Sequence, residues 1–146
     1  DAPSTITRLQ NMGTPDYLIS AACSLVLGQR LARKTCVECR EEDPDITPKV
    51  LTEFGFTAEQ ASRAKVVRGK GCPKCKDSGY KGRMGIYEVL NVTKAVKEAI
   101  LRKATTPELR EIAIKEGFRT MNDMGRQMIL SGDLNFREYE RVLTMG

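Results

Sequence analysis

Histidine and tryptophan are absent from this chain of 146 residues, and aromatic residues make up only 5% of it. Without histidine the chain has no Ser–His or Cys–His nucleophilic pair and no imidazole metal ligand, so any metal must bind through sulfur or carboxylate oxygen. The scarcity of aromatic residues beside an apolar fraction of 40% favours aliphatic helices, or a piece of a larger protein, over an aromatic-rich β-sandwich.

Long apolar runs are missing as well. No stretch of about 18 apolar residues is present to span a bilayer. The opening residues Asp1–Ser4 lack the basic-then-apolar order of a signal peptide. We therefore expect one average domain or two small ones, with no direct membrane insertion.

Five cysteines stand out against these absences, and four of them form two C-x-x-C units, Cys36–Cys39 and Cys72–Cys75. Two intervening residues let a tight turn present both sulfurs to one ion at about 2.3 Å, and two such turns complete a closed, structural tetrahedron. The sequence therefore predicts one Zn²⁺ held by Cys36, Cys39, Cys72 and Cys75. Cys23 lies on an apolar face with no partner cysteine in register, which is typical of a small core residue.

Other interpretations of the two units stay open. The 32 residues between them exceed the about 15–20 of the common zinc-ribbon template, but a helical hairpin looped out of the metal site accounts for the difference. Thiol redox chemistry would need a single unit between a strand and a helix, and does not explain two. Plain buried thiols remain possible, and spacing alone does not exclude an iron–sulfur cluster.

The net charge is +5, and basic residues cluster on both sides of the cysteines. They either offset the charge of a Zn(Cys)₄ centre, or are simply solvated, or bind nucleic-acid phosphates. The first two interpretations are favoured because no aromatic platforms alternate with the charges. The alternative is a zinc-ribbon nucleic-acid-binding module. The residues concerned are Arg30, Arg33, Lys34, Arg40, Lys65, Arg68, Lys70, Lys74, Lys76, Lys81 and Arg83.

The segment Gly69–Gly71 resembles a phosphate-binding loop in its glycine content, but it lacks the residue pattern of a P-loop. A P-loop needs glycine five residues before the Gly-Lys pair and serine or threonine directly after it. Here those positions hold Ala64 and Gly71. The chain has no recognisable nucleotide-hydrolysing machinery of its own.

Local signals predict mostly helix. A strand is favoured over 24–33, where Gly28 disfavours helix, and another over 84–89, with bends at Gly79, Gly82 and Gly85. Residues 41–45 read as an acidic turn. Helices are expected over 4–12, after a Thr14 cap, over 47–54 and 57–63, from Thr93, from Thr106, over 121–130, and from Asn135 onward.

Three segments carry a resemblance to a known family: residues 29–36, 71–75 and 79–90. They resemble the C-terminal end of the extension ATPase of type IV pili and of its relative, the type II secretion ATPase. The beginning of the chain, around 1–9, and the tail segments 108–110, 117–121 and 132–142 fall in the same order. The resemblance covers essentially the whole chain.

The resemblance implies an α+β fold, mostly α, in three parts: residues 1–34 as the C-terminal edge of a RecA-like ATPase domain, 35–90 as a Cys₄ zinc-binding subdomain with short strands, and 91–146 as a helical C-terminal subdomain. It implies a hexameric cytoplasmic parent that uses ATP and Mg²⁺ and lies peripheral to the inner membrane. The implied partners are other subunits of the homohexamer and a membrane platform protein, with no nucleic acid. The ATP-handling motifs have no matching positions here, so only the four cysteines carry over.

Overall fold

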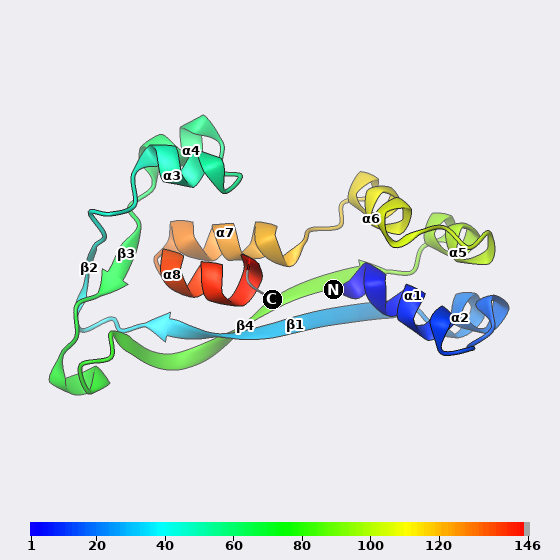
Figure 1. The fold of residues 1–146 in the computed structure, drawn as a ribbon, viewed down its shortest axis with the longest axis horizontal. Helices are drawn as coiled ribbons and strands as arrows, with labels where there is room; N and C mark the ends of the chain where they lie inside the picture. Colours follow the sequence, from blue (N-terminus) through cyan, green and yellow to red (C-terminus); the bar gives the residue numbers. More distant parts are fainter. Residues whose placement is uncertain (145–146) are drawn as a thin grey trace. The chain divides into compact units, whose positions relative to one another are not determined.

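The computed structural model describes residues 1–144, which fall into two compact units. Unit 1 comprises residues 1–29 and 87–121, and unit 2 comprises residues 30–86 and the chain from Asn122 onward. Helices and strands are both present and helix predominates (Figure 1), which confirms the expected mixed, mainly helical class. Within residues 1–144, every helix is too short or too polar to cross a membrane.

The chain alternates between helices and two separate strand pairs. Strand β1 pairs with β4, and β2 pairs with β3. The strands are β1 Leu25–Thr35, β2 Arg40–Glu42, β3 Val67–Gly69 and β4 Tyr80–Asn91. The helices are α1 Ala2–Asn11, α2 Asp16–Ala22, α3 Pro48–Glu53, α4 Ala58–Arg63, α5 Lys94–Leu101, α6 Thr106–Lys115, α7 Met121–Ser131 and α8 Phe136–Tyr139, with a 3-10 turn η1 at Pro73–Cys75 and a π-helical turn η2 at Glu140–Thr144.

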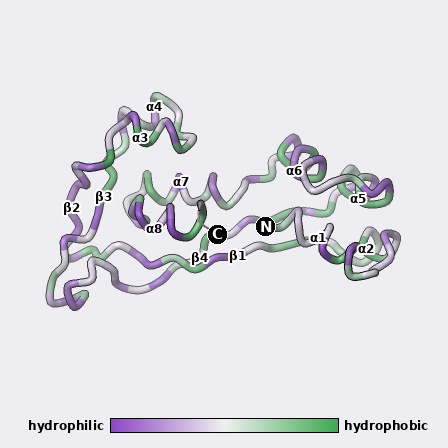
Figure 2. Tube along the Cα trace, viewed as in Figure 1, coloured by the Kyte–Doolittle hydropathy of each residue, from purple (hydrophilic) through white to green (hydrophobic). Residues whose placement is uncertain are grey.

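Unit 1 is built on helices with one apolar face each. Hydrophobic and hydrophilic residues alternate along α5 and α6 (Figure 2), as expected of helices that bury one side. The buried faces form an aliphatic core with Ile6, Ile19, Ile100 and Leu109 among its fully buried members. As the scarcity of aromatic residues predicts, the core of unit 1 is built mainly from aliphatic side chains such as isoleucine and leucine.

Some helix starts of unit 1 follow the sequence signals and others do not: the first helix, expected from residue 4, begins at Ala2 after an Asp1 cap. Thr93 caps α5 by accepting a hydrogen bond from the Val96 N–H, as expected. The expected Thr14 cap of α2 is wrong: Pro15 occupies the N-cap position and makes no side-chain capping bond. Proline is tolerated there because its missing N–H would have no helical acceptor.

Glu88 is a buried carboxylate of unit 1 that sequence patterns did not single out. Its oxygens accept hydrogen bonds from the Ala2 N–H, at the start of α1, and from the Met121 N–H at 2.9 Å, at the start of α7. A side chain at Gly28 would meet the Met121 and Glu88 side chains, since a Cβ there would lie 2.9 and 3.1 Å from them. Glu88 thus satisfies two helix-start N–H groups that would otherwise be buried without acceptors.

Unit 2 contains the insertion between the two C-x-x-C units. Strands β2 and β3 lie side by side and lead to the hairpin of α3 and α4 (Figure 1). Thr47 caps α3, and Thr57 with Gln60 forms a capping box on α4. The looped-out helical hairpin is confirmed. The expected acidic turn is wrong at its start, because Glu41 and Glu42 lie in β2 and pair with β3.

The chain end of unit 2 packs through aromatic rings. Phe54 makes an edge-to-face contact with Phe136, with ring centroids 4.8 Å apart, and Tyr139 lies beside both. Asn135 caps α8 by accepting from the Glu138 N–H at 2.8 Å, as expected. The final helix is shorter than expected, because the regular α-helical pattern gives way to η2 after Tyr139.

The strands lie where they were expected, but β4 is longer than expected. The segment 24–33 is β1, as favoured. The expected short strands describe only β2 and β3, because β4 runs for 12 residues and contains both Gly82 and Gly85. Alternating burial of Ile86, Glu88 and Leu90 shows why the strand continues past the expected bends.

Candidate metal centre

The four cysteines of the two C-x-x-C units converge in unit 2. Their sulfur atoms all lie within 4.8 Å of one another. Cys36 Sγ lies 3.8 Å from Cys72 Sγ, Cys39 Sγ lies 3.8 Å from Cys75 Sγ, and the Cys72 and Cys75 sulfurs are 3.7 Å apart. Four sulfurs at about 2.3 Å from one ion in a regular tetrahedron would be about 3.8 Å apart. The spacing therefore fits a tetrahedral metal and is too long for disulfides, whose S–S bond is about 2.05 Å.

The β2–β3 ladder explains how two cysteine pairs with 32 residues between them meet. Arg40 pairs with Gly69 in an antiparallel register, so the residues flanking the ladder, Cys39 and Lys70, are also neighbours. The Lys70 N–H donates to the Cys39 carbonyl at 3.0 Å. The insertion is closed at its base by this ladder, which brings the second cysteine pair back to the first.

We call the C-x-x-C turns Cys36–Cys39 and Cys72–Cys75 the first and second knuckle. Close backbone contact between Gly69 and Gly79 holds the second knuckle against the β2–β3 ladder. A Cβ on Gly69 would lie 2.0 Å from the Gly79 carbonyl oxygen, which no side chain could tolerate. Gly79 itself has a φ of 81°, in the left-handed region that favours glycine. The Gly79 carbonyl also accepts from the Cys36 N–H at 2.9 Å. Both glycines are therefore required to bring the two knuckles together.

Backbone N–H groups point at the sulfurs. Cys39 Sγ accepts from the Gly71 N–H at 3.2 Å, and Cys75 Sγ accepts from the N–H groups of Cys72, at 3.3 Å, and Gly79, at 3.2 Å. Such N–H···S bonds stabilise thiolate charge, which metal-bound cysteines carry. These N–H groups thus act in favour of the thiolate form of both side chains, although at Cys39 burial and the neighbouring thiols outweigh the effect.

The thiols of the cluster differ in acidity. Burial raises the pKa of Cys75, but hydrogen bonds from Gly79 and Cys72 lower it more, to about 6. Burial raises the pKa of Cys39, and the neighbouring thiols raise it further, to about 12, against the lowering effect of the Gly71 N–H.

The remaining cysteine has a different setting. Cys23 belongs to unit 1 and packs, partly buried, against its aliphatic core. This agrees with the expected role of a small core residue. The arrangement of cysteines supports a single four-thiol centre that could hold a metal ion in a closed, water-free coordination sphere.

A second polar cluster of unit 2 surrounds Glu138, whose side chain is fully buried. Arg33 donates to its carboxylate from the backbone N–H at 2.7 Å and from Nη2 at 2.9 Å, and Arg141 donates from Nε and Nη2, each at 2.7 Å. The Arg33 guanidinium also lies 4.0 Å above the Tyr80 ring. The sequence pattern placed Glu138 only in the first turn of the helix expected from Asn135. The i, i+3 spacing to Arg141 was the available signal for its second role.

Several of the basic residues around the cysteines are already paired. Arg33 is engaged by Glu138, and Arg68 by Glu41 at 3.2 Å and Asp45 at 3.5 Å. Lys70 and Lys74 are exposed. The basic cluster is therefore partly neutralised by acids of the same unit, a role that neither of the favoured interpretations included.

Comparison of the sequence with known proteins identifies a family. The Type II/IV secretion system protein family matches residues 1–141. The chain is 37% identical over 141 residues to the Type IV pilus assembly ATPase PilB of Pseudomonas aeruginosa, covering 97% of the chain and 25% of that protein. It is 37% identical over 139 residues to the PilB of Thermus thermophilus, covering 94% of the chain and 15% of that protein.

A secretion protein is similar over the same region. The putative type II secretion system protein E of Escherichia coli K12 is 31% identical over 141 residues, covering 97% of the chain and 28% of that protein. The chain thus spans between 15% and 28% of the length of these three relatives. The resemblance read from residues 29–36, 71–75 and 79–90 is confirmed: this chain belongs to the Type II/IV secretion system protein family.

Proposed function

We propose that this chain is the C-terminal part of a hexameric cytoplasmic ATPase that powers type IV pilus assembly or type II secretion. Support comes from the family match over residues 1–141 and from relatives named as pilus assembly ATPases and secretion proteins. In such a parent, residues 1–34 would complete a RecA-like ATPase domain, 35–90 the metal-binding subdomain and 91–146 a helical subdomain. ATP and Mg²⁺ would bind to the parent, outside the segment described here.

The four-cysteine centre would hold Zn²⁺ with a structural role. The observation that carries this proposal is three sulfur separations of 3.7–3.8 Å, with all four sulfurs within 4.8 Å of one another, which suits tetrahedral binding of one ion. Thiolate binding of zinc contributes on the order of 10 kcal/mol to the folding of small metallo-domains. Zinc would supply this stability by cross-linking Cys36 and Cys39 to Cys72 and Cys75.

We further propose that the rigid centre transmits ATP-driven motion to the inner-membrane platform protein. The insertion carrying α3 and α4 is joined to the centre by a ladder of only three residue pairs. Cross-linking at the base of this ladder would let α3 and α4 move with the centre as one body. A rigid connection of this kind passes on displacement, whereas a loose one would absorb it.

The test uses the full-length parent protein with Cys72→Ser and, as the matched control, Cys23→Ser. Cys72→Ser is expected to reduce pilus assembly or secretion more strongly than ATP hydrolysis, because coupling is lost while the nucleotide site remains. Cys23→Ser should leave both nearly unchanged, since Cys23 is not a ligand. Wild-type assembly by the Cys72→Ser protein would overturn the coupling role.

A further inference from the structure

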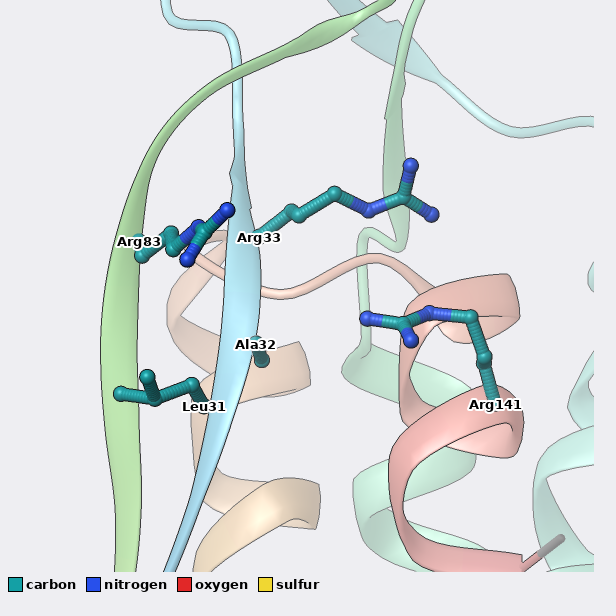
Figure 3. Close-up of a pocket in the computed structure, with 5 residues that line it drawn as sticks. All are labelled: Leu31, Ala32, Arg33, Arg83 and Arg141. Atoms are coloured by element: carbon teal, nitrogen blue, oxygen red, sulfur yellow. The ribbon is translucent and has the colours of Figure 1, made fainter.

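Three arginines of unit 2 line one hollow with a volume of about 410 Å³. Arg33 and Arg141 reach toward one another from β1 and η2, while Arg83, from β4, lies on the other side of the β1 ribbon together with the Leu31 side chain (Figure 3). The residues come from three segments far apart in the sequence. The fold therefore gathers positive charge at this point.

Glu138 is the acidic group that the structure places against these arginines. Its carboxylate pairs with Arg33 and Arg141, and among the described residues Arg83 has no ion pair. Three guanidinium charges against one carboxylate leave a surplus of two positive charges. The cluster is thus under-neutralised by the residues that the structure describes.

Two of the guanidinium groups are held in place before any ligand arrives. Glu138 engages Nε and Nη2 of both Arg33 and Arg141, and the Tyr80 ring supports the plane of Arg33. The Nη1 groups take no part in these bonds. Because the side chains are already ordered, an anion that binds them has less rotamer entropy to overcome.

The chemistry of the hollow suits a doubly charged oxyanion. Guanidinium groups bind phosphate oxygens through paired N–H donors, and a phosphate monoester carries close to two negative charges near pH 7. A surplus of two positive charges matches that dianion better than a single carboxylate of an acidic peptide. A phosphate on a small molecule and a phosphate on a lipid headgroup offer the same group.

We propose that Arg33, Arg83 and Arg141 form a binding site for a doubly charged phosphate group. Glu138 acts as the positioning residue that orients Arg33 and Arg141, and Arg83 supplies a guanidinium that forms no ion pair with residues 1–144. This site is independent of the four-cysteine centre and of any role in pilus assembly or secretion.

The test is titration calorimetry of the chain with inorganic phosphate and pyrophosphate at low ionic strength, together with flotation on phosphatidylcholine vesicles with and without phosphatidic acid. Arg83→Gln should weaken phosphate binding about tenfold without lowering the melting temperature, because Arg83 makes no ion pair with residues 1–144. The matched control is Arg63→Gln, an exposed arginine of the same unit paired only with Glu59, which should bind like the wild type.

The outcomes separate the possible sources of the phosphate. Binding of pyrophosphate that depends on Arg83 supports a small-molecule ligand, and Arg83-dependent flotation on phosphatidic acid vesicles alone supports a lipid headgroup. Equal losses in Arg83→Gln and Arg63→Gln, or no binding in either assay, would overturn the proposal.

Discussion

Glu138 and Arg141 form a two-pronged ion pair across one turn, with both Oε atoms 2.7 Å from nitrogens of the same guanidinium. Burial raises the pKa of the Glu138 carboxyl, but hydrogen bonds from Arg141 and Arg33 lower it more, to about 2. Because two half-exposed arginines hold this buried acid in its charged form, the free energy of unfolding should depend on pH in the acid range.

The first prediction concerns acid unfolding. Because the folded-state pKa of Glu138 lies below its ordinary value of 4.5, this residue stabilises the fold above about pH 4.5, and the contribution is lost as pH falls toward 2. The contribution at neutral pH is about 3 kcal/mol. Urea unfolding measured between pH 7 and pH 2.5 should show this decline. Glu138→Gln should lower the free energy of unfolding at pH 7 and make it depend less on pH below about 4.5. Parallel curves of unfolding free energy against pH for the wild type and the variant would contradict the role of Glu138.

A second prediction tests the buried Glu88. Glu88→Gln leaves one of two helix-start N–H groups, at Ala2 or Met121, without a carboxylate acceptor, because an amide offers only one oxygen. We expect a loss of about 1–3 kcal/mol in the free energy of unfolding. Glu98→Gln, on the exposed side of α5, is the matched control and should change stability by less than about 0.5 kcal/mol. Equal effects of the two changes would refute the role of Glu88.

A third prediction concerns the contact between Gly69 and Gly79. Gly69→Ala would force a Cβ to within 2.0 Å of the Gly79 carbonyl, so the backbone must shift and the two knuckles must separate. We expect a loss of about 2–4 kcal/mol and weaker metal binding, measured by competition with a chromogenic chelator. At Gly13, where a Cβ would meet nothing but φ is 92°, alanine should cost only about 1–2 kcal/mol and leave metal affinity unchanged.

A fourth prediction separates this protein from a nucleic-acid-binding zinc ribbon. Arg68 is paired with Glu41 and Asp45 of unit 2, so its charge is not free for phosphate backbones. We expect duplex DNA retention on a column to be weak at low salt and absent near physiological ionic strength. Tight retention with a steep decline as salt rises would instead favour the nucleic-acid alternative.

The sequence was informative where a local rule decides the structure. Thr47, Thr57 and Thr93 start helices because a side-chain oxygen three residues before an unsatisfied N–H is enough to fix a helix end. The C-x-x-C spacing likewise predicted a four-sulfur centre, because each short turn by itself presents two sulfurs to one point. The β2–β3 ladder then brings the two turns together.

The parts that escaped prediction depend on tertiary contacts. Glu138 looked like a helix-start residue, because nothing local reveals that Arg33, more than a hundred positions away, returns to the same point. Glu41 and Glu42 looked like a turn, because only the partner strand β3 makes them a strand. The hollow lined by Arg33, Arg83 and Arg141 was invisible for the same reason.

Native mass spectrometry of the purified chain, alongside Cys72→Ser and Cys23→Ser, measures the metal content of the centre directly. The wild type and Cys23→Ser should each carry one zinc ion per chain, and Cys72→Ser should bind it far more weakly. A wild-type chain that carries no metal when purified with zinc present, or one whose four knuckle cysteines pair as disulfides, would contradict a tetrahedral zinc centre.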